Sequence, residues 1–75
     1  MSRTNRFKVI RGIDALQQAQ SAREQARWHV RHRNDFPSDA EWGAYCERSA
    51  EGFWSIARAQ VRYARQLFAH SGVFS

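Results

Sequence analysis

The sequence is poor in the residues that interrupt helices or crosslink small proteins. Its 75 residues include one proline, four glycines and one cysteine, Cys46. A single cysteine excludes an internal disulfide and a thiolate zinc cluster, and it favours a reducing, cytoplasmic environment. Residues 1–12 carry basic charges but no apolar core or cleavage motif, so we expect no signal peptide.

Large aliphatic side chains are also scarce. Isoleucine, leucine and valine total nine, whereas alanine alone numbers eleven and aromatic residues number ten. No apolar run approaches the roughly 18 residues of a membrane span. A chain of this size hides only about 60% of its surface, which leaves little room for both a core and a catalytic pocket. Aromatic side chains are enriched at contact surfaces, so we expect self-association.

Acidic residues are outnumbered, seven against twelve basic ones, for a net charge of +5. Five of the seven acids fall within residues 35–51, and the segments on either side are basic. Opposite charges come together if the chain folds back on itself at this point.

The segment 13–33 predicts a helix. It contains no glycine or proline and is rich in good helix formers. A narrow stripe recurs at spacings of three and four: Ala15, Ala19, Ala22, Ala26 and Val30. The preceding arm, residues 1–12, alternates weakly like a strand, yet Phe7, Ile10 and Ile13 have helical spacing. Strand and helix both remain open for the arm.

A second helix is predicted over residues 39–70. Pro37 cannot continue the first helix, and Ser38 and Glu41 match a capping box in which Ser38 accepts a hydrogen bond from the amide of Glu41. Gly72 suits the left-handed residue that ends a helix in a Schellman motif.

Gly52 lies inside this second segment. Uninterrupted, the helix would span about 48 Å and exceed the first helix in length. Gly52 either bends or breaks it, or the helix continues, since an interior glycine costs only about 1 kcal/mol. We favour a long helix, with or without a bend.

Two apolar stripes run along the second helix. One has heptad spacing and is predicted to form the core or a dimer contact: Trp54, Ala57, Val61, Ala64 and Phe68. The other lies beside it: Trp42, Tyr45, Ile56, Tyr63 and Leu67. Together they form an arc wider than one neighbouring helix covers. We therefore expect an all-α antiparallel hairpin (domain 13–75, preceded by the arm) that dimerises into a four-helix-type bundle.

No residue pattern points to an enzyme, a metal or a cofactor. His29 and His32 have metal-pair spacing, but they lack a third ligand and have cationic neighbours, so we interpret both as solvated surface histidines. Cys46 stands beside Glu47, which would raise the pKa of the thiol, and we interpret it as a spacer rather than a nucleophile. There is no glycine-rich phosphate loop and no hydrolase or metalloprotease motif.

Known DNA-binding and membrane-binding patterns fit poorly. A helix-turn-helix with its turn at Gly52 would place Arg48 and Arg58 at positions that need small and apolar residues. A ribbon-helix-helix strand over residues 6–10 would be followed by a first helix too long for that fold. The basic amphipathic segment 53–69 could lie on an anionic membrane, but ordinary packing within the protein explains it better.

Two classes of function remain. The first is a non-enzymatic protein-binding module, an adaptor or inhibitor whose anchors are Trp28, Trp42 and Tyr45, because Trp, Tyr and Arg dominate binding hot spots. The second is nucleic-acid binding through a basic pole of seven side chains: Arg3, Arg6, Lys8, Arg11, Arg58, Arg62 and Arg65. We favour the first class. The general composition resembles that of small accessory proteins of phages and mobile elements that redirect host machinery, although no motif carries this resemblance.

Overall fold

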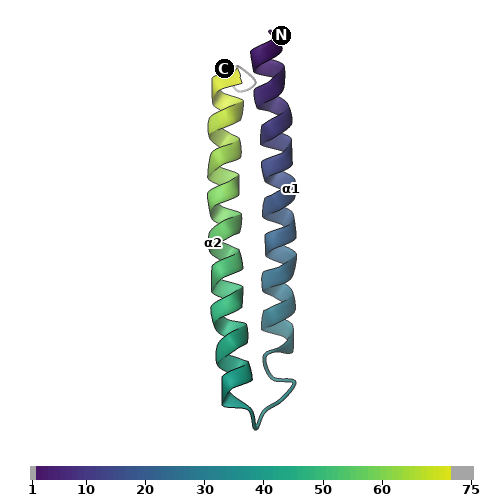
Figure 1. Ribbon diagram of the computed structural model, residues 1–75, viewed down its shortest axis with the longest axis vertical. Coiled ribbons are helices and arrows are strands. Elements are labelled where there is room, and N and C mark those ends of the chain that lie inside the picture. The colour runs from purple at the N-terminus through teal and green to yellow at the C-terminus, as the bar shows by residue number, and fades with distance from the viewer. Residues whose placement is uncertain (1, 72–75) are drawn as a thin grey trace.

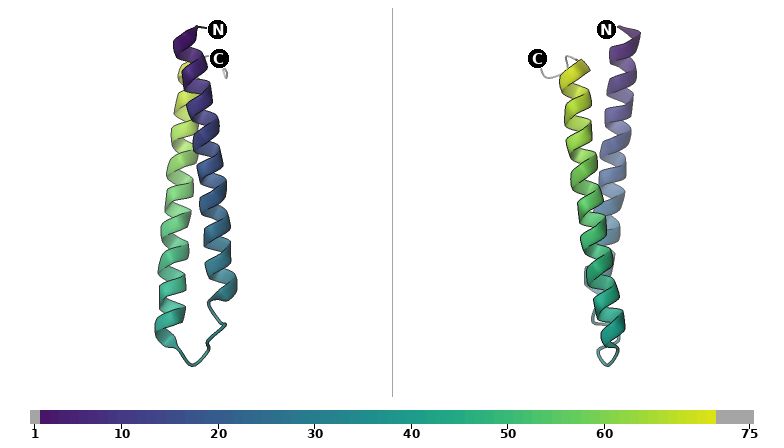
Figure 2. Two further views of the ribbon diagram at one scale, coloured as in Figure 1. Left: turned by 45° about the vertical axis from the view of Figure 1, so that its right-hand side comes forward. Right: turned by 60° about the vertical axis from the view of Figure 1, so that its left-hand side comes forward.

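The computed structural model describes residues 2–71, which form two helices packed as an antiparallel hairpin. Helix α1 spans Arg3–His32 and helix α2 spans Ala40–Ser71, with the connection 33–39 at one end of the molecule (Figure 1). The Cα atoms extend over 57 × 14 × 12 Å, so the molecule is a rod. The two helices remain side by side in all three orientations (Figures 1 and 2). The predicted all-α hairpin is confirmed.

Helix α1 begins at Arg3, ten residues before the predicted start near Ile13. The hydroxyl Oγ of Ser2 caps it by accepting a hydrogen bond of 3.2 Å from the amide of Asn5. The basic arm, for which strand and helix were both open, is helical over residues 3–12 and continuous with the rest of α1. The helices contain 30 and 32 residues, so α2 exceeds α1 by only two residues, far less than expected.

Helix α2 begins one residue later than the capping box implied. The amide of Trp42 donates to Oδ1 of Asp39 over 3.0 Å, so Asp39 is the N-cap and the assignment of Ser38 was wrong. A carboxylate at this position accepts a hydrogen bond from a backbone amide that would otherwise have no partner in the helix, and it also interacts favourably with the helix dipole. The stop signal at Gly72 lies outside the described residues.

Helix α2 continues through Gly52 without interruption. A Cβ atom added at Gly52 would meet no atom within 4 Å, so no neighbouring group requires glycine at this position within the hairpin. The expectation of one long second helix is confirmed.

The core between the helices consists mainly of alanine. Among the described residues, eight hydrophobic ones have at most 5% of their surface exposed: Ala15, Ala19, Ala22, Ala26, Cys46, Ala50, Ala57 and Ala64. Such small side chains let two helices approach closely. Of the predicted seam, Ala57 and Ala64 are buried, whereas the larger Trp54, Val61 and Phe68 are half-buried at its edge.

The predicted stripe of α1 is correct at its four alanines but not at its last residue. Val30 is 48% exposed, and His29 is buried in its place. Positions 15, 19, 22, 26 and 29 follow spacings of four, three, four and three, the regular repeat of a coiled-coil seam. The shift to His29 keeps this repeat facing α2.

Gly12 lies where the aromatic ring of Phe68 crosses α1. A Cβ atom at Gly12 would come within 2.5 Å of Cε1 of Phe68, closer than real Cβ contacts. The absence of a side chain here therefore lets the ring lie directly against the α1 backbone.

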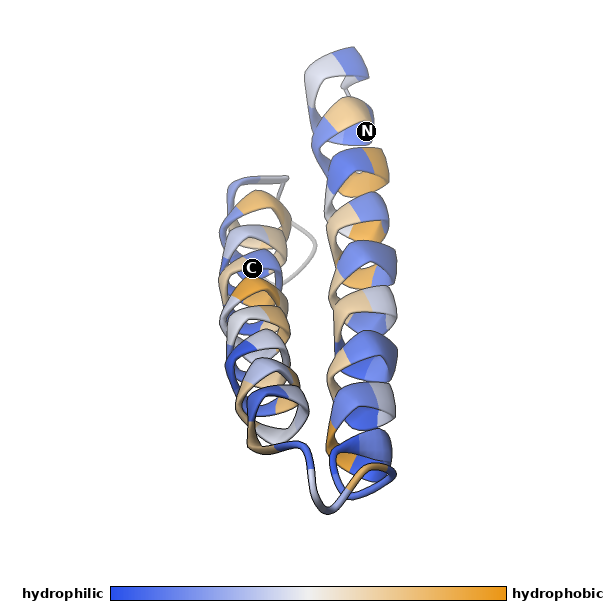
Figure 3. Cartoon of the chain, turned by 60° about the horizontal axis from the view of Figure 1, so that its bottom comes forward, coloured by the Kyte–Doolittle hydropathy of each residue, from blue (hydrophilic) through white to orange (hydrophobic). Residues whose placement is uncertain are grey.

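Apolar residues are not confined to the space between the helices, as the hydropathy colouring shows (Figure 3). Even so, neither α1 nor α2 contains a stretch that is both apolar and long enough to span a bilayer.

Candidate functional site

Aromatic and imidazole rings gather at the turn end of the hairpin. Three of these rings come from the last turns of α1, one from the connection and three from the first half of α2. We call this group the turn-end cluster: Trp28, His29, His32, Phe36, Trp42, Tyr45 and Phe53. It contains all three side chains predicted as partner anchors, which lie 17 residues apart in sequence at most.

His29 is the centre of the cluster. Its ring contacts Trp28 edge-on at 5.0 Å between centroids, Tyr45 edge-on at 5.8 Å and Phe53 in a stacked arrangement at 5.5 Å. It therefore joins rings from both helices, at separations typical of favourable aromatic pairs.

The expectation that His29 is a solvated surface residue was wrong. Only 7% of its surface is exposed, and its Nδ1 atom lies 2.7 Å from the carbonyl oxygen of Gln25. A carbonyl oxygen only accepts hydrogen bonds, so Nδ1 carries a proton and donates it. The signal that could have identified this role is the position of His29 in the seam repeat, three residues after Ala26.

Trp42 links the start of α2 to the end of α1. Its indole Nε1–H donates to the carbonyl oxygen of His32 over 2.8 Å, and its ring meets Phe36 edge-on at 5.6 Å and Tyr45 at 5.8 Å. The same carbonyl, at the C-terminus of α1, also accepts a hydrogen bond of 3.1 Å from the amide of Asp35, so the Trp42 indole is its second donor. Trp42 thus has a structural task in addition to its predicted role as an anchor.

Two polar contacts complete the turn end. Nδ1 of His32 lies 2.6 Å from Oδ2 of Asp35, and Nη1 of Arg33 lies 3.5 Å from Oε1 of Glu47 on α2. Trp28 packs on the His32 ring at 4.4 Å. Of these contacts, the pair of Arg33 and Glu47 links the end of α1 to α2, between two exposed side chains.

A large part of the cluster surface is open to solvent. Trp28 is 44% exposed, Tyr45 49% and Phe36 57%. Trp28, His29, Tyr45 and Phe53 also line a hollow on one side of the hairpin, together with Glu24, Gln25 and Arg31. The arrangement is an apolar patch with a polar border, as in many protein-binding surfaces.

The seven residues of the basic pole lie in the half of the rod opposite the turn. This half, residues 3–18 and 58–71, contains those seven basic side chains and one acid, Asp14, whereas residues 19–57 carry five arginines and six acids. Within the described part of the chain, none of the seven forms an ion pair. The structure therefore separates charge along the long axis.

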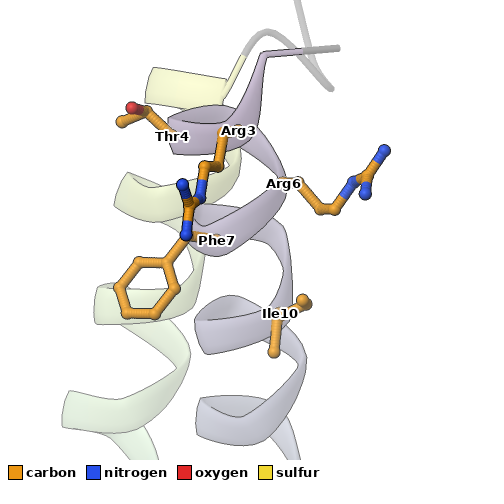
Figure 4. A pocket seen from close by; sticks show the side chains of 5 residues that line it. All are labelled: Arg3, Thr4, Arg6, Phe7 and Ile10. Atoms are coloured by element: carbon orange, nitrogen blue, oxygen red, sulfur yellow. The ribbon is translucent and has the colours of Figure 1, made fainter.

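The pole is nevertheless distributed over different faces. Arg11 borders a hollow with Asp14, Gln60 and Tyr63. Arg3 and Arg6 lie at the α1 terminus beside Phe7 and Ile10, where the side chain of Arg3 runs toward the Phe7 ring and that of Arg6 points away from it (Figure 4). Lys8 is half-buried.

Arg58, Arg62 and Arg65 share a different hollow with Arg23 of α1, and Trp54 forms part of its wall. We call these five residues the arginine face. The basic pole predicted from the sequence does not include Arg23, which lies on α1. Only the packing of α1 on α2 shows that Arg23 reaches the same face.

Cys46 is fully buried in the seam. Burial raises the pKa of its thiol, and the nearby Asp35 carboxylate contributes in the same direction. The predicted spacer role agrees with this burial, but the predicted electrostatic cause, Glu47, is replaced by Asp35. Over residues 2–71, no three potential metal ligands come together.

Comparisons with protein families, with curated proteins and with solved structures find no match to this chain. The turn-end cluster and the arginine face are therefore the features from which a function is inferred.

Proposed function

We propose that this chain is a small non-enzymatic protein-binding module, a cytoplasmic adaptor or inhibitor that acts as a homodimer on a larger protein. The turn-end cluster is its contact surface, with Trp28, Tyr45 and Phe36 as the exposed anchors and Trp42 as the residue that positions the connection. The small accessory proteins of phages and mobile elements offer a model for such a role.

The observation that supports this proposal is the exposure of three aromatic side chains on a supported cluster. Trp28, Phe36 and Tyr45 each expose between 44% and 57% of their surface. The inner part of the cluster is ordered, because His29 is buried and the Trp42 indole forms a hydrogen bond to the end of α1. Rigid aromatic side chains contribute large contact areas at a low entropic cost, and Trp and Tyr are frequent hot spots.

The test is capture of partners from a cell lysate with immobilised protein, with and without nuclease treatment. A protein partner stays bound after nuclease treatment. Trp28→Ala should then weaken capture by about 30-fold, which corresponds to about 2 kcal/mol for a hot spot. Trp28 is preferable to Trp42 because its indole makes no hydrogen bond that the connection requires.

Phe7→Ala serves as the matched control. Phe7 is 59% exposed, more than Trp28, and lies at the opposite end of the rod. If Trp28→Ala and Phe7→Ala weaken capture equally, the turn-end cluster is not the contact surface.

A second candidate is nucleic-acid binding through the arginine face. The observation that favours it is the convergence of Arg23 from α1 with Arg58, Arg62 and Arg65 from α2 around Trp54. Arginine neutralises phosphates, and an aromatic ring in the same hollow gives a base a surface on which to stack.

Salt dependence separates this candidate from the first. Duplex DNA binding should weaken steeply with salt, and replacing Arg58, Arg62 and Arg65 by Gln should reduce the slope by about 0.9 for each lost phosphate contact. A gel shift that disappears in these variants, together with capture that nuclease abolishes, would replace the first proposal by the second.

A further inference from the structure

Helix α2 carries a second heptad stripe that α1 leaves largely exposed. Its residues follow spacings of four, three, four, three and four: Tyr45, Ser49, Gly52, Ile56, Ala59 and Tyr63. The three large side chains are 49%, 49% and 40% exposed in chain order, and none of the six is charged. This spacing is that of a helix seam. Helix α1 reaches the stripe only near its ends, where His29 contacts Tyr45 and Asp14 borders a hollow with Tyr63.

The stripe is shaped to receive a side chain near its middle. Tyr45, Ser49, Phe53 and Ile56 surround Gly52 in a shallow hollow, and a Cβ atom at Gly52 would touch nothing. If a second α2 runs antiparallel across this point, heptad registers place Ile56 or Tyr63 of the second copy over Gly52. With Tyr63 over Gly52, Ile56 also lies opposite Ala59 of the other copy, so that large side chains meet small ones, as in a packed helix interface.

The charge distribution selects the antiparallel orientation. The end of the rod with the termini carries seven basic side chains and one acid, and the turn half carries five arginines and six acids. Parallel copies would place the two strongly basic ends together. Antiparallel copies place each basic end beside the nearly neutral turn half of the other copy, which avoids this repulsion.

The exposed area also fits a second copy. The chain exposes 5748 Å², whereas a compact monomer of its mass is expected to expose about 4800 Å². The excess follows from the elongated shape of the hairpin, which leaves surface available for the roughly 800 Å² that each partner buries in a standard interface. A hairpin whose core is mainly alanine also buries little large apolar surface of its own.

We infer that the middle of this stripe, formed by Gly52, Ile56, Ala59 and Tyr63, is the homodimer interface: two copies pack antiparallel through α2, with the two-fold axis close to Ile56. Tyr45 lies at the margin of this interface and belongs to the turn-end cluster. This rests on the homodimer of the proposed function and specifies its surface, orientation and central contact. It also shifts the dimer contact away from the predicted Trp54–Phe68 seam, which lies against α1.

Sedimentation equilibrium of the full chain provides the first test. At micromolar concentration the wild type should have about twice the 8.8 kDa mass of one chain. Gly52→Lys should weaken dimerisation at least 10-fold, because the new side chain occupies the centre of the stripe. Ile56→Lys should act in the same direction.

Gly52→Lys leaves the hairpin intact because the site has open space and lysine favours helix more than glycine does. Ala44→Lys is the matched control, since Ala44 is an exposed residue of α2 outside the stripe. A monomeric wild type, or a Gly52→Lys variant that dimerises as strongly as Ala44→Lys, would overturn the inference.

Spin labels test the orientation in a Cys46→Ala background. Labels at residue 44 should be about 30–40 Å apart in an antiparallel pair, from the helical rise of 1.5 Å per residue, and labels at residue 55 should be close. Short distances at both positions would indicate parallel copies and contradict the proposal. Partner capture through Trp28 is measured separately, so failure of either proposal is recognised independently of the other.

Discussion

Single residues at the close contacts of this hairpin have effects that helix propensity alone does not predict. Gly12 is the clearest case, because the Phe68 ring occupies the space that a Cβ atom would need. Helix propensity favours alanine over glycine by about 1 kcal/mol, whereas the contact disfavours it. The two effects oppose each other at one position.

A double-mutant cycle separates them. In a Phe68→Leu background, Gly12→Ala should raise the free energy of unfolding by about 1 kcal/mol. In the wild-type background the gain should be smaller or reversed, because the ring must move. Denaturant titration of the four proteins measures the coupling. Equal gains in both backgrounds would show that Phe68 moves without cost.

The N-cap of α2 gives a second residue-scale prediction. Asp39→Ala should lower the free energy of unfolding by about 1 kcal/mol, since it removes the acceptor for the Trp42 amide. Ser38→Ala should change it by less than about 0.5 kcal/mol, as expected for an exposed residue outside the helix. Thermal or denaturant melts compare the two, and a larger loss for Ser38→Ala would restore the capping box.

Cys46 links stability to pH. Its pKa is raised by burial, so the thiol stays protonated in the fold. Below the ordinary thiol pKa of about 8.5, the thiol is protonated in both the folded and the unfolded state, and its burial has no ionisation cost. Above this pH, the thiol of the unfolded chain ionises before that of the folded chain. The free energy of unfolding therefore declines as the pH rises. The denaturant concentration at the unfolding midpoint should decrease as the pH is raised from 7.5 to 9.5. Cys46→Ala should make this decrease smaller. Native protein should also react slowly with a thiol reagent, and rapid reaction would contradict the burial.

At the scale of the elements, the start of α1 is decided by packing. Its first turn has no acidic residue to complement the helix dipole, and Thr4, Asn5 and Val9 have modest helix propensity. Half-buried Val9 and the contact of Gly12 with Phe68 nevertheless tie this segment to the end of α2. Residues 3–12 are therefore part of the hairpin.

Deletion of residues 2–11 tests this conclusion. The shortened chain should lose more helix than the deleted residues account for, because the last turns of α2 would no longer pack against α1. Circular dichroism per chain and the thermal midpoint measure the effect. A dispensable arm would leave the midpoint of the remaining hairpin unchanged.

At the scale of the whole molecule, the protein is a rod along whose long axis the positive charge is unevenly distributed. The radius of gyration of the Cα atoms is 16.8 Å, against about 11 Å for a compact domain of 75 residues. The aromatic cluster lies at one end of this rod and most of the positive charge at the other. In the two proposals a protein partner would approach the turn end, whereas a nucleic acid would approach the arginine face, which extends from the middle of the rod toward the basic end.

The sequence by itself determined the helical hairpin, its alanine seam and the position of its turn. These depend on local propensity, on the spacing of small residues and on Pro37, all of which act over a few residues. Tertiary structure decided the start of α1 at Arg3, the burial of His29 and the arrival of Arg23 on the arginine face. Each of these depends on the register in which α1 packs against α2. That register is a relation between segments distant in sequence, and no local sequence pattern predicts it.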